Sequence, residues 1–335
     1  MGKKIKVQDI ADALGISRNT VSKVLNGKYV PERTRIAVIK KAEELNYKSM
    51  GNINEEKNYS ILLLSGKPLS NIDYYLPIIR KIENNCFQKN YGLLSVTLNM
   101  SSSISEQLDS IINSFHPDGI ICVEIFDNNI VNTIIKLKLP TCFIDFPSNN
   151  VKADDNYDII IPDTYDYGRE IRDAIKKYDI KDISFIGDFR HCLTFKKRYL
   201  ELKMAMFYSG LDAARDIDIV DKDNYNYSDP VKLKDRISEK ANNSQLFVCA
   251  NDYIARQTIT ALKLLKKKIP EEVKIIGFDG AFDALHASPT ITTANVDKEA
   301  YGQMVFNALI NRIKDPMLKT TLIEFRVKAT KGETL

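Results

Sequence analysis

The chain has 335 residues, of which 44% are hydrophobic and 27% are charged. These values are ordinary for a globular protein, and the length suggests more than one domain. No run of about 18 apolar residues is present and the opening MGKKIKVQDI has no apolar core, so we expect neither a membrane span nor a secretory signal, and a cytoplasmic location. The formal net charge is +4, yet residues 1–50 hold eleven Lys or Arg against five Asp or Glu. This basic segment indicates contact with a polyanion.

The first elements along the chain are three short helices. The first has an apolar face at helical spacing, formed by Val7, Ile10, Ala11 and Leu14. Gly15 can end it in a left-handed conformation, and Ser17 can cap a second helix that reaches about Leu25. A third follows Pro31, with its apolar face at Val38, Ile39, Ala42 and Leu45. The tight turn between the first two predicts a small all-α helix-turn-helix head over residues 1–47.

The second helix lies in ISRNTVSKVLNG and has an unusually polar outer side. A recognition helix enters the major groove of DNA with its N-terminus first. Arg and Lys suit guanine, Asn suits adenine, and small hydroxyls fit phosphates. We therefore expect contacts with double-stranded DNA from Lys6, Ser17, Arg18, Asn19, Thr20, Ser22, Lys23, Asn26 and Thr34. The alternative is an ordinary solvated helix face.

Residues 48–58, KSMGNINEEKN, are polar and predict a linker. The body that follows, residues 59–335, alternates apolar strands with helices, which favours an α/β fold of two doubly wound parallel-sheet subdomains. We predict helices over Leu76–Lys89, Ser105–Phe115, Lys196–Ser209 and Ile254–Lys267. We predict strands over Tyr59–Ser65, Leu93–Thr97, Gly119–Glu124, Thr141–Phe146, Ile159–Ile161, Ile183–Gly187, Ile217–Val220, Leu246–Ala250 and Lys274–Asp279.

Polar residues just past the ends of these strands are candidates for a binding site. Open parallel sheets bind ligands beyond the carboxyl ends of their strands. The residues at such positions are Asp145, Asp188, Asn251 and Asp279.

These segments together resemble the LacI/GalR family of bacterial transcription repressors. VQDIADALGISRNTVSKVLNG is similar to the family's helix-turn-helix, and ERTRIAVIKKAEELNY to its third helix. In the body, PDGIIC, LPTCFIDF, CANDYIARQTITALKLLKKKIPEEVKIIGFDG and ITTANVDKEAYGQMVFNALI resemble family landmarks in the same order. The resemblance implies a homodimeric repressor whose body has two subdomains of periplasmic-binding-protein type. It also implies three crossovers between them, near Pro162, Ala294 and Thr320.

With those crossovers, the first subdomain is expected over about 59–161 and 295–319, and the second over about 162–294 and 320–335. The resemblance places a small-molecule effector, commonly a sugar or a nucleobase derivative, between them. It assigns effector contacts to Tyr74, Tyr75, Asp145, Arg198, Asn251 and Asp279. Guanidinium, amide, carboxylate and aromatic groups together suit a carbohydrate.

All of the effector candidates except Asp279 also have a structural alternative. Asp145 could cap a turn, and Asn251 could cap the helix that follows it. Arg198 could instead pair with Glu201, where the family usually has Gly. The two tyrosines could be ordinary core contacts.

The linker departs most from the family pattern. The resemblance implies a short hinge helix whose Leu wedges into the minor groove and kinks the DNA. Glu56 stands at that position with Glu55 beside it, and carboxylates are repelled by the groove. Ile53 or Met50 could serve instead if the register shifts. We expect weaker DNA bending than in relatives, with specificity resting on the heads.

Other classes of protein fit the sequence less well. None of the motifs GxxxxGK[ST], GxGxxG after a strand, HExxH or GxSxG is present, so no enzyme activity and no cofactor is expected. The five cysteines form no CxxC pair and the three histidines are isolated, which favours buried free thiols and no metal site. The remaining alternative is a ligand-binding sensor or scaffold with a weakened DNA-binding head.

Overall fold

The computed structural model describes residues 5–25, 30–45, 47, 58–66, 72–149, 156–220, 226–315 and 317–335. The chain divides into two compact units, residues 1–59 with 87–92, and residues 60–86 with 93–335. The predicted DNA contact Asn26 and the linker positions Met50, Ile53, Glu55 and Glu56 lie outside the described residues.

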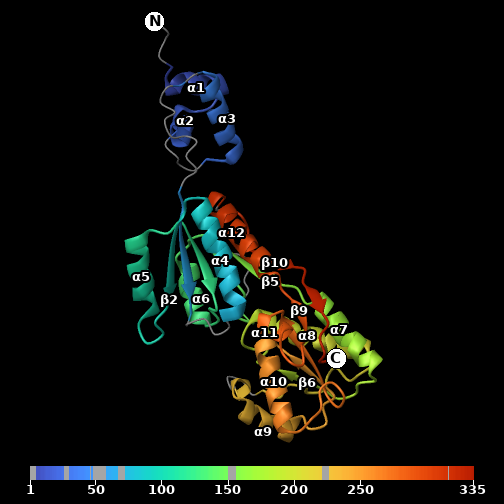
Figure 1. Cartoon of the computed structure of the whole chain (residues 1–335). Coiled ribbons are helices and arrows are strands. Elements are labelled where there is room, and N and C mark those ends of the chain that lie inside the picture. The colour runs from blue at the N-terminus through green and yellow to red at the C-terminus, as the bar shows by residue number, and fades with distance from the viewer. Residues whose placement is uncertain are drawn as a thin grey trace. The chain divides into compact units, whose positions relative to one another are not determined.

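The head consists of helices α1 (Val7–Leu14), α2 (Arg18–Leu25) and α3 (Glu32–Glu44) (Figure 1). Their apolar faces meet in one core of buried side chains, namely Ile10, Ala11, Val21, Val24, Val30, Val38 and Ala42. Gly15 ends α1 with a left-handed backbone (φ 63°), and the Ser17 Oγ accepts the Thr20 N–H at 3.0 Å. Both turn signals predicted from the sequence are therefore confirmed.

The first sheet of the body has six strands in the order β10-β5-β4-β3-β1-β2. These are Thr321–Phe325, Tyr157–Pro162, Thr141–Ile144, Gly119–Val123, Ser60–Ser65 and Gly92–Thr97. Helices α5 (Ile104–Phe115) and α6 (Asn128–Lys136) share its apolar core. Helix α12 (Lys298–Lys314) packs on β3, β4 and β5. It lies close to α4 (Ile72–Gln88), because a Cβ at Gly302 would meet the Ile78 carbonyl at 2.5 Å.

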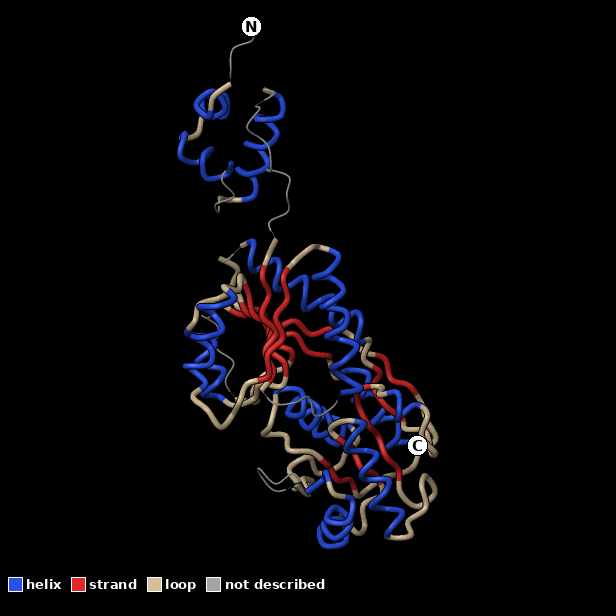
Figure 2. The backbone as a smooth tube through the Cα atoms, turned by 60° about the vertical axis from the view of Figure 1, so that its left-hand side comes forward, coloured by secondary structure: helices blue, strands red, loops and turns tan. Residues whose placement is uncertain are grey.

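The second sheet has five strands in the order β11-β9-β8-β7-β6, which are Lys328–Thr330, Thr292–Asn295, Lys274–Asp279, Leu246–Cys249 and Ile183–Ile186. Its helices are α7 (Tyr165–Lys177), α8 (Leu193–Tyr208), α9 (Pro230–Lys240), α10 (Asp252–Leu264) and the short α11 (Phe282–Leu285). A 3₁₀ turn spans Asn226–Ser228. Figure 2 shows the two sheets as separate groups of strands. The predicted class, a helix-turn-helix head with a parallel α/β body, is confirmed.

The chain passes between the two sheets after Pro162, after Asn295 and after Phe325. The first two positions agree with the sequence prediction, and the third does not. Residues 320–335 were assigned to the second subdomain, but β10 pairs in parallel with β5 and is an edge strand of the first sheet. Only β11 returns to the second sheet, antiparallel to β9. The last crossover therefore lies between Phe325 and Lys328.

One predicted strand is absent. Ile217–Val220 forms a single bridge, Phe185 with Asp218, beside β6. Its apolar side chains are buried, but the carboxylates of Asp216 and Asp218 accept the backbone N–H groups of Asp218 and Val220, which holds the backbone in turns instead of a ladder. All five cysteines are buried free thiols. Within the described ranges, no helix combines the length and the apolar composition that crossing a bilayer requires.

Candidate functional sites: a DNA-facing helix and a cavity in the body

The outer side of α2 presents polar side chains while its inner side is buried. Val21 and Val24 are in the head core, whereas Arg18, Asn19 and Lys23 are exposed. Ser17 and Lys6 are also exposed, and Thr20, Ser22 and Thr34 are partly buried. Except for Asn26, which is not described, the predicted DNA contacts therefore have some surface available to a partner.

Neither Lys6 before α1 nor Pro31 before α3 has a hydroxyl that could cap its helix, but each helix start is compensated locally. Lys6 precedes α1 without a side-chain cap, but its backbone N–H donates to the Asp9 carboxylate at 2.6 Å. Pro31 precedes α3, and its carbonyl accepts the N–H groups of Thr34 and Arg35. Asp9 thus supplies one half of a capping box, which offsets part of the cost of having no capping hydroxyl at Lys6.

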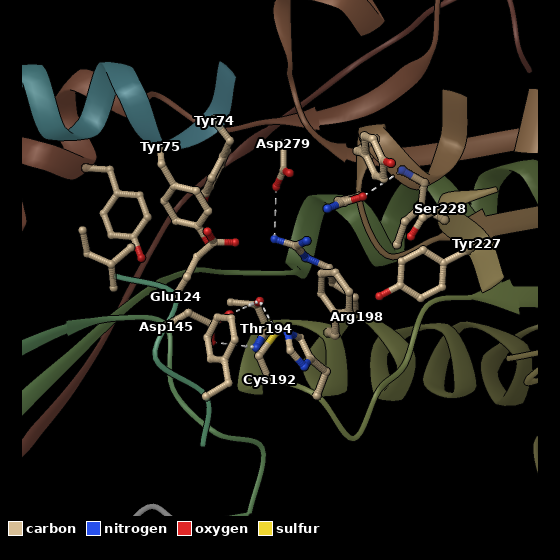
Figure 3. A pocket seen from close by; sticks show the side chains of 18 residues that line it. Tyr74, Tyr75, Glu124, Asp145, Cys192, Thr194, Arg198, Tyr227, Ser228 and Asp279 are labelled. Carbon is tan, nitrogen blue, oxygen red and sulfur yellow. Dashed lines mark hydrogen bonds and ion pairs between the residues drawn. The ribbon is translucent and has the colours of Figure 1, made fainter. Parts of the chain in front are cut away.

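The body contains a cavity of about 280 Å³ between its two sheets (Figure 3). All six predicted effector residues line it, Tyr74, Tyr75, Asp145, Arg198, Asn251 and Asp279. The tyrosines come from the first turn of α4, and Asp145 follows β4. Arg198 lies on α8, while Asn251 and Asp279 stand at the ends of β7 and β8. The rule of strand carboxyl ends therefore explains three of the six positions.

Arg198 is the cationic centre of this cavity. Its side chain is 3% exposed, and its guanidinium lies 3.6 Å from the centre of the Phe278 ring. It donates to the Ala250 carbonyl at 2.5 Å and to Asp279 Oδ1 at 3.4 Å, while its Nε has no hydrogen-bond partner among the described residues. The alternative pairing of Arg198 with Glu201 is wrong, because Glu201 pairs with Arg172.

Two of the predicted effector residues also have structural roles. Asp145 accepts the backbone N–H of Phe146 at 2.7 Å, and it accepts both the backbone N–H and the hydroxyl of Thr194 in the first turn of α8. The Asn251 side chain accepts the Ile254 N–H at 2.9 Å and so caps α10. Lining the cavity and capping a helix are thus combined in the same side chains.

Burial dominates the electrostatics of the cavity. It raises the pKa of Asp279 to about 6, although Arg198 and Lys298 oppose the shift. Burial also raises the pKa of Tyr74 and Tyr75 well above the ordinary range, so both phenols are neutral donors at pH 7. The two rings meet edge to face at 5.0 Å between centroids. The cavity thus offers hydrogen-bond donors, carboxylates and aromatic faces.

The sequence prediction missed several lining residues and included one wrong strand-end residue. Asp188 does not line the cavity, because it accepts two hydrogen bonds from Arg190. Glu124 does line it, immediately after β3, and the strand-end rule would have found it had the strand been ended at Val123. The other missed side chains are mainly aromatic: Phe126, His191, Phe195, Tyr227, Tyr253 and Tyr301. Of these, only Tyr253 had a local signal, since it follows the Asn251–Asp252 step.

Comparisons with known proteins agree with this arrangement. Residues 6–49 match the family described as bacterial regulatory proteins, lacI family, and residues 173–334 match the periplasmic binding protein-like domain. The chain is 26% identical over 327 residues to the HTH-type transcriptional repressor PurR of Pasteurella multocida, with 95% of each chain covered. It is also 26% identical over 329 residues to PurR of Pectobacterium atrosepticum, covering 95% of this chain and 93% of that one.

Solved structures show the same fold at lower sequence identity. A transcriptional regulator CelR–cellobiose complex superimposes with a TM-score of 0.71 at 19% identity, covering 99% of this chain and 100% of that one. A lac repressor dimer bound to operator and an anti-inducer superimposes with a TM-score of 0.66 at 16% identity, covering 99% of each.

A helix-turn-helix head joined to a two-sheet body with an internal cavity defines a DNA-binding regulator with an effector-binding domain. The chain belongs to the LacI/GalR family of bacterial transcription regulators.

Proposed function

We propose that this protein is a transcription repressor that acts as a homodimer in the cytoplasm. A small carbohydrate or related metabolite in the body cavity controls its affinity for operator DNA. The observation that carries this proposal is the combination, in one chain, of an exposed polar face on α2 and a cavity in which the Arg198 Nε has no hydrogen-bond partner among the residues that the structure describes. The first suits the major groove, and the second suits an oxygen-rich ligand.

The names of relatives support the same proposal. The PurR relatives are transcriptional repressors. The CelR structure contains cellobiose, and a further neighbour from Enterococcus faecium contains ribose, with a TM-score of 0.66 at 16% identity. A polyhydroxylated ligand would find donors in Arg198 and the neutral tyrosines, and acceptors in the carboxylates. The aromatic rings would cover the apolar face of a sugar ring.

The DNA contacts are tested with Arg18→Ala and Asn19→Ala. Each should cost roughly 1–3 kcal/mol on a specific site and relax the base preference there, because each removes hydrogen bonds to a base edge. Affinity for random DNA should change little. Mobility shifts on DNA from upstream of the protein's own gene measure both quantities. Arg169→Ala, on the exposed surface of α7, is a matched control.

Equal losses on specific and random DNA would mean that the two side chains touch only phosphates. If the unmodified protein bound its upstream DNA no better than random DNA, the alternative of a sensor or scaffold with a weakened head would replace the repressor proposal.

The oligomeric state is a separate prediction. A single helix-turn-helix head buries little surface, so specific binding generally needs two half-sites and a two-fold dimer. We expect light scattering to give twice the chain mass of 38.1 kDa. A stable monomer at micromolar concentration would contradict this.

A further inference from the structure

The turn after β8 holds the cavity residue Asp279 in a strained backbone conformation. Asp279 has a φ of 112°, and Gly280 after it has a φ of 61°. A left-handed backbone is uncommon for a residue with a Cβ and persists only where the surroundings impose it. A side chain at position 280 would not fit, because its Cβ would lie 2.1 Å from the Asn295 Oδ1. The position of the Asp279 carboxylate therefore depends on the groups that hold this turn.

The N–H groups of the turn are held from within the second subdomain. The Gly280 N–H donates to the Thr293 Oγ1 at 3.2 Å, and the Ala281 N–H donates to the Asp252 Oδ2 at 2.8 Å. Thr293 lies in β9, and Asp252 is the first residue of α10. The carbonyl groups of the turn need a donor from elsewhere, since each buried backbone group requires a partner.

Lys298 supplies that donor from the first subdomain. Its Nζ donates to the carbonyls of Asp279 at 2.8 Å, Gly280 at 2.9 Å and Val296 at 3.2 Å. An ammonium group has three N–H donors, so three carbonyls can engage all of them. Lys298 is the first residue of α12, which packs on the first sheet. One side chain of the first subdomain thus holds the strained turn of the second subdomain and a carbonyl of the crossover between them.

Asp279 therefore stands between two cations. Its carboxylate faces the Arg198 guanidinium at 3.4 Å (Figure 3), and its carbonyl accepts from the Lys298 ammonium. The Lys298 Nζ also lies 5.9 Å from the centre of the Tyr74 ring, which lines the cavity. Lys298 itself is not among the lining residues. It acts on a bound molecule only through the neighbours that it holds.

The first turn of α12 also contacts the other two crossovers. Tyr301, one turn after Lys298, donates its hydroxyl to the Ile160 carbonyl at 2.5 Å, near the end of β5. The Tyr301 ring packs on Phe325, the last residue of β10, with 4.8 Å between centroids. Rotation of the subdomains about their three connections would therefore displace Lys298 relative to the turn at Asp279.

We propose that Lys298 is a positioning residue of the effector site, which fixes the turn that presents Asp279 and couples this turn to the arrangement of the two subdomains. This inference rests on the proposed function, because it concerns regulation only if the cavity binds the effector. An effector that contacts Asp279 and Arg198 then favours one arrangement of the subdomains, since the turn is fastened to α12.

Hydrogen exchange of the full-length protein, without sugar or DNA, tests the positioning. Lys298→Met keeps the length of the side chain and removes the donor. We expect the amides of Gly280, Ala281 and Val296 to exchange about tenfold faster or more, because opening the turn no longer breaks bonds to an ammonium. Exchange in β3, at the centre of the first sheet, should not change. Lys298→Arg, which can still donate to carbonyls, should keep most of the protection.

Lys263→Met is the matched control. It removes an exposed lysine that donates to a single carbonyl of the second subdomain, that of Ser288 at 3.1 Å. It should leave exchange around Asp279 unchanged, and circular dichroism checks that all variants fold. Unchanged exchange around Asp279 in Lys298→Met would overturn the inference. Equally fast exchange in β3 would also overturn it, because Lys298 would then contribute only general stability.

Ribose and cellobiose, which two structural neighbours contain, are the probes for the effector site. Binding is detected by thermal shift and measured by calorimetry. A probe that binds the unmodified protein should bind Lys298→Met about tenfold more weakly or worse, and Lys263→Met equally well. Equal affinity in Lys298→Met would contradict the inference. If neither probe binds the unmodified protein, the exchange result alone decides the inference.

Operator mobility shifts with and without the bound probe separate failure of this inference from failure of the proposed function. A probe that binds but leaves operator affinity unchanged would contradict only the proposed control of DNA binding. A probe that alters operator affinity equally in the unmodified protein and in Lys298→Met would sink only the role of Lys298.

Discussion

Replacing Arg312 with Leu should lower the free energy of unfolding by roughly 3–5 kcal/mol, because it leaves a buried carboxylate without its partner. The Arg312 side chain is fully buried on α12. Its Nε donates to Asp158 Oδ2 at 2.9 Å, and its Nη2 donates to the other oxygen of Asp158. This two-pronged geometry is the strongest arrangement of a guanidinium with a carboxylate.

The same guanidinium also forms hydrogen bonds with the segment that leads into β10. It donates to the Leu318 carbonyl at 2.9 Å and to the Lys319 carbonyl at 2.8 Å, and it also binds Asn156 Oδ1 at 2.9 Å. Without it, those carbonyls lose partners at a partly buried site, which adds to the cost. We therefore expect the loss of stability to be greatest at β10, the edge strand that precedes the third crossover.

Urea denaturation at fixed protein concentration measures the effect. Arg215→Leu breaks an exposed pair with Asp182 (2.7 Å) and should cost at most about 1 kcal/mol. Adding Asp158→Leu to Arg312→Leu should recover part of the loss, since the stranded charge is then gone. A cost below about 1 kcal/mol for Arg312→Leu alone would show that the pair adds little beyond packing.

Replacing Arg198 with Ala should abolish effector binding and make stability depend on pH near neutrality. Burial already raises the pKa of Asp279 to about 6 against the opposing guanidinium. Removing the guanidinium should raise that pKa further. The folded state then binds more protons than the unfolded state, whose Asp pKa is about 3.9. Stability should therefore fall as the pH rises from 6 to 8, by up to about 1.4 kcal/mol per pH unit.

The unmodified protein should change less over the same range, because most of its Asp279 titration lies below pH 7. Denaturation midpoints at pH 6, 7 and 8 compare the two proteins, and calorimetry with the metabolite found by thermal shift measures effector affinity. Arg198→Ala combined with Asp279→Asn removes the titrating group and should lose the pH dependence. Unchanged effector affinity in Arg198→Ala would contradict the assignment of this cavity as the effector site.

Local sequence patterns determined the head and most elements of the body. Apolar spacing located α1, α2 and α3, and the turn signals at Gly15 and Ser17 have the predicted geometry. Such signals can be read without the rest of the chain because helices and caps depend on residues three or four apart. The alternation of strands and helices likewise placed Asp145, Asn251 and Asp279 at strand carboxyl ends.

The same rules failed where contacts and backbone geometry beyond the strand itself decide the outcome. Asp188 satisfies the strand-end rule, but it pairs outside the cavity with Arg190, which also pairs with Asp218. Glu124 was read as the last residue of a strand, and its left-handed backbone shows that the strand has already turned there. Whether a polar side chain at a strand end enters a cavity depends on packing that no local window contains.

Tertiary structure alone decided which strand belongs to which sheet and which charges meet. Thr321–Phe325 joins the first sheet because β5 has an open edge beside it. Arg312 also donates to the Lys319 carbonyl, in the segment that leads into this strand. Arg198 and Asp279 come from a helix and a strand end far apart in sequence, and they meet only because both lie at the carboxyl edge of the second sheet. Hydrophobic periodicity specifies which face of an element is buried, but every apolar face can pack on many others. The partner is selected only when the whole core is assembled, since close packing and the pairing of buried charges admit few arrangements.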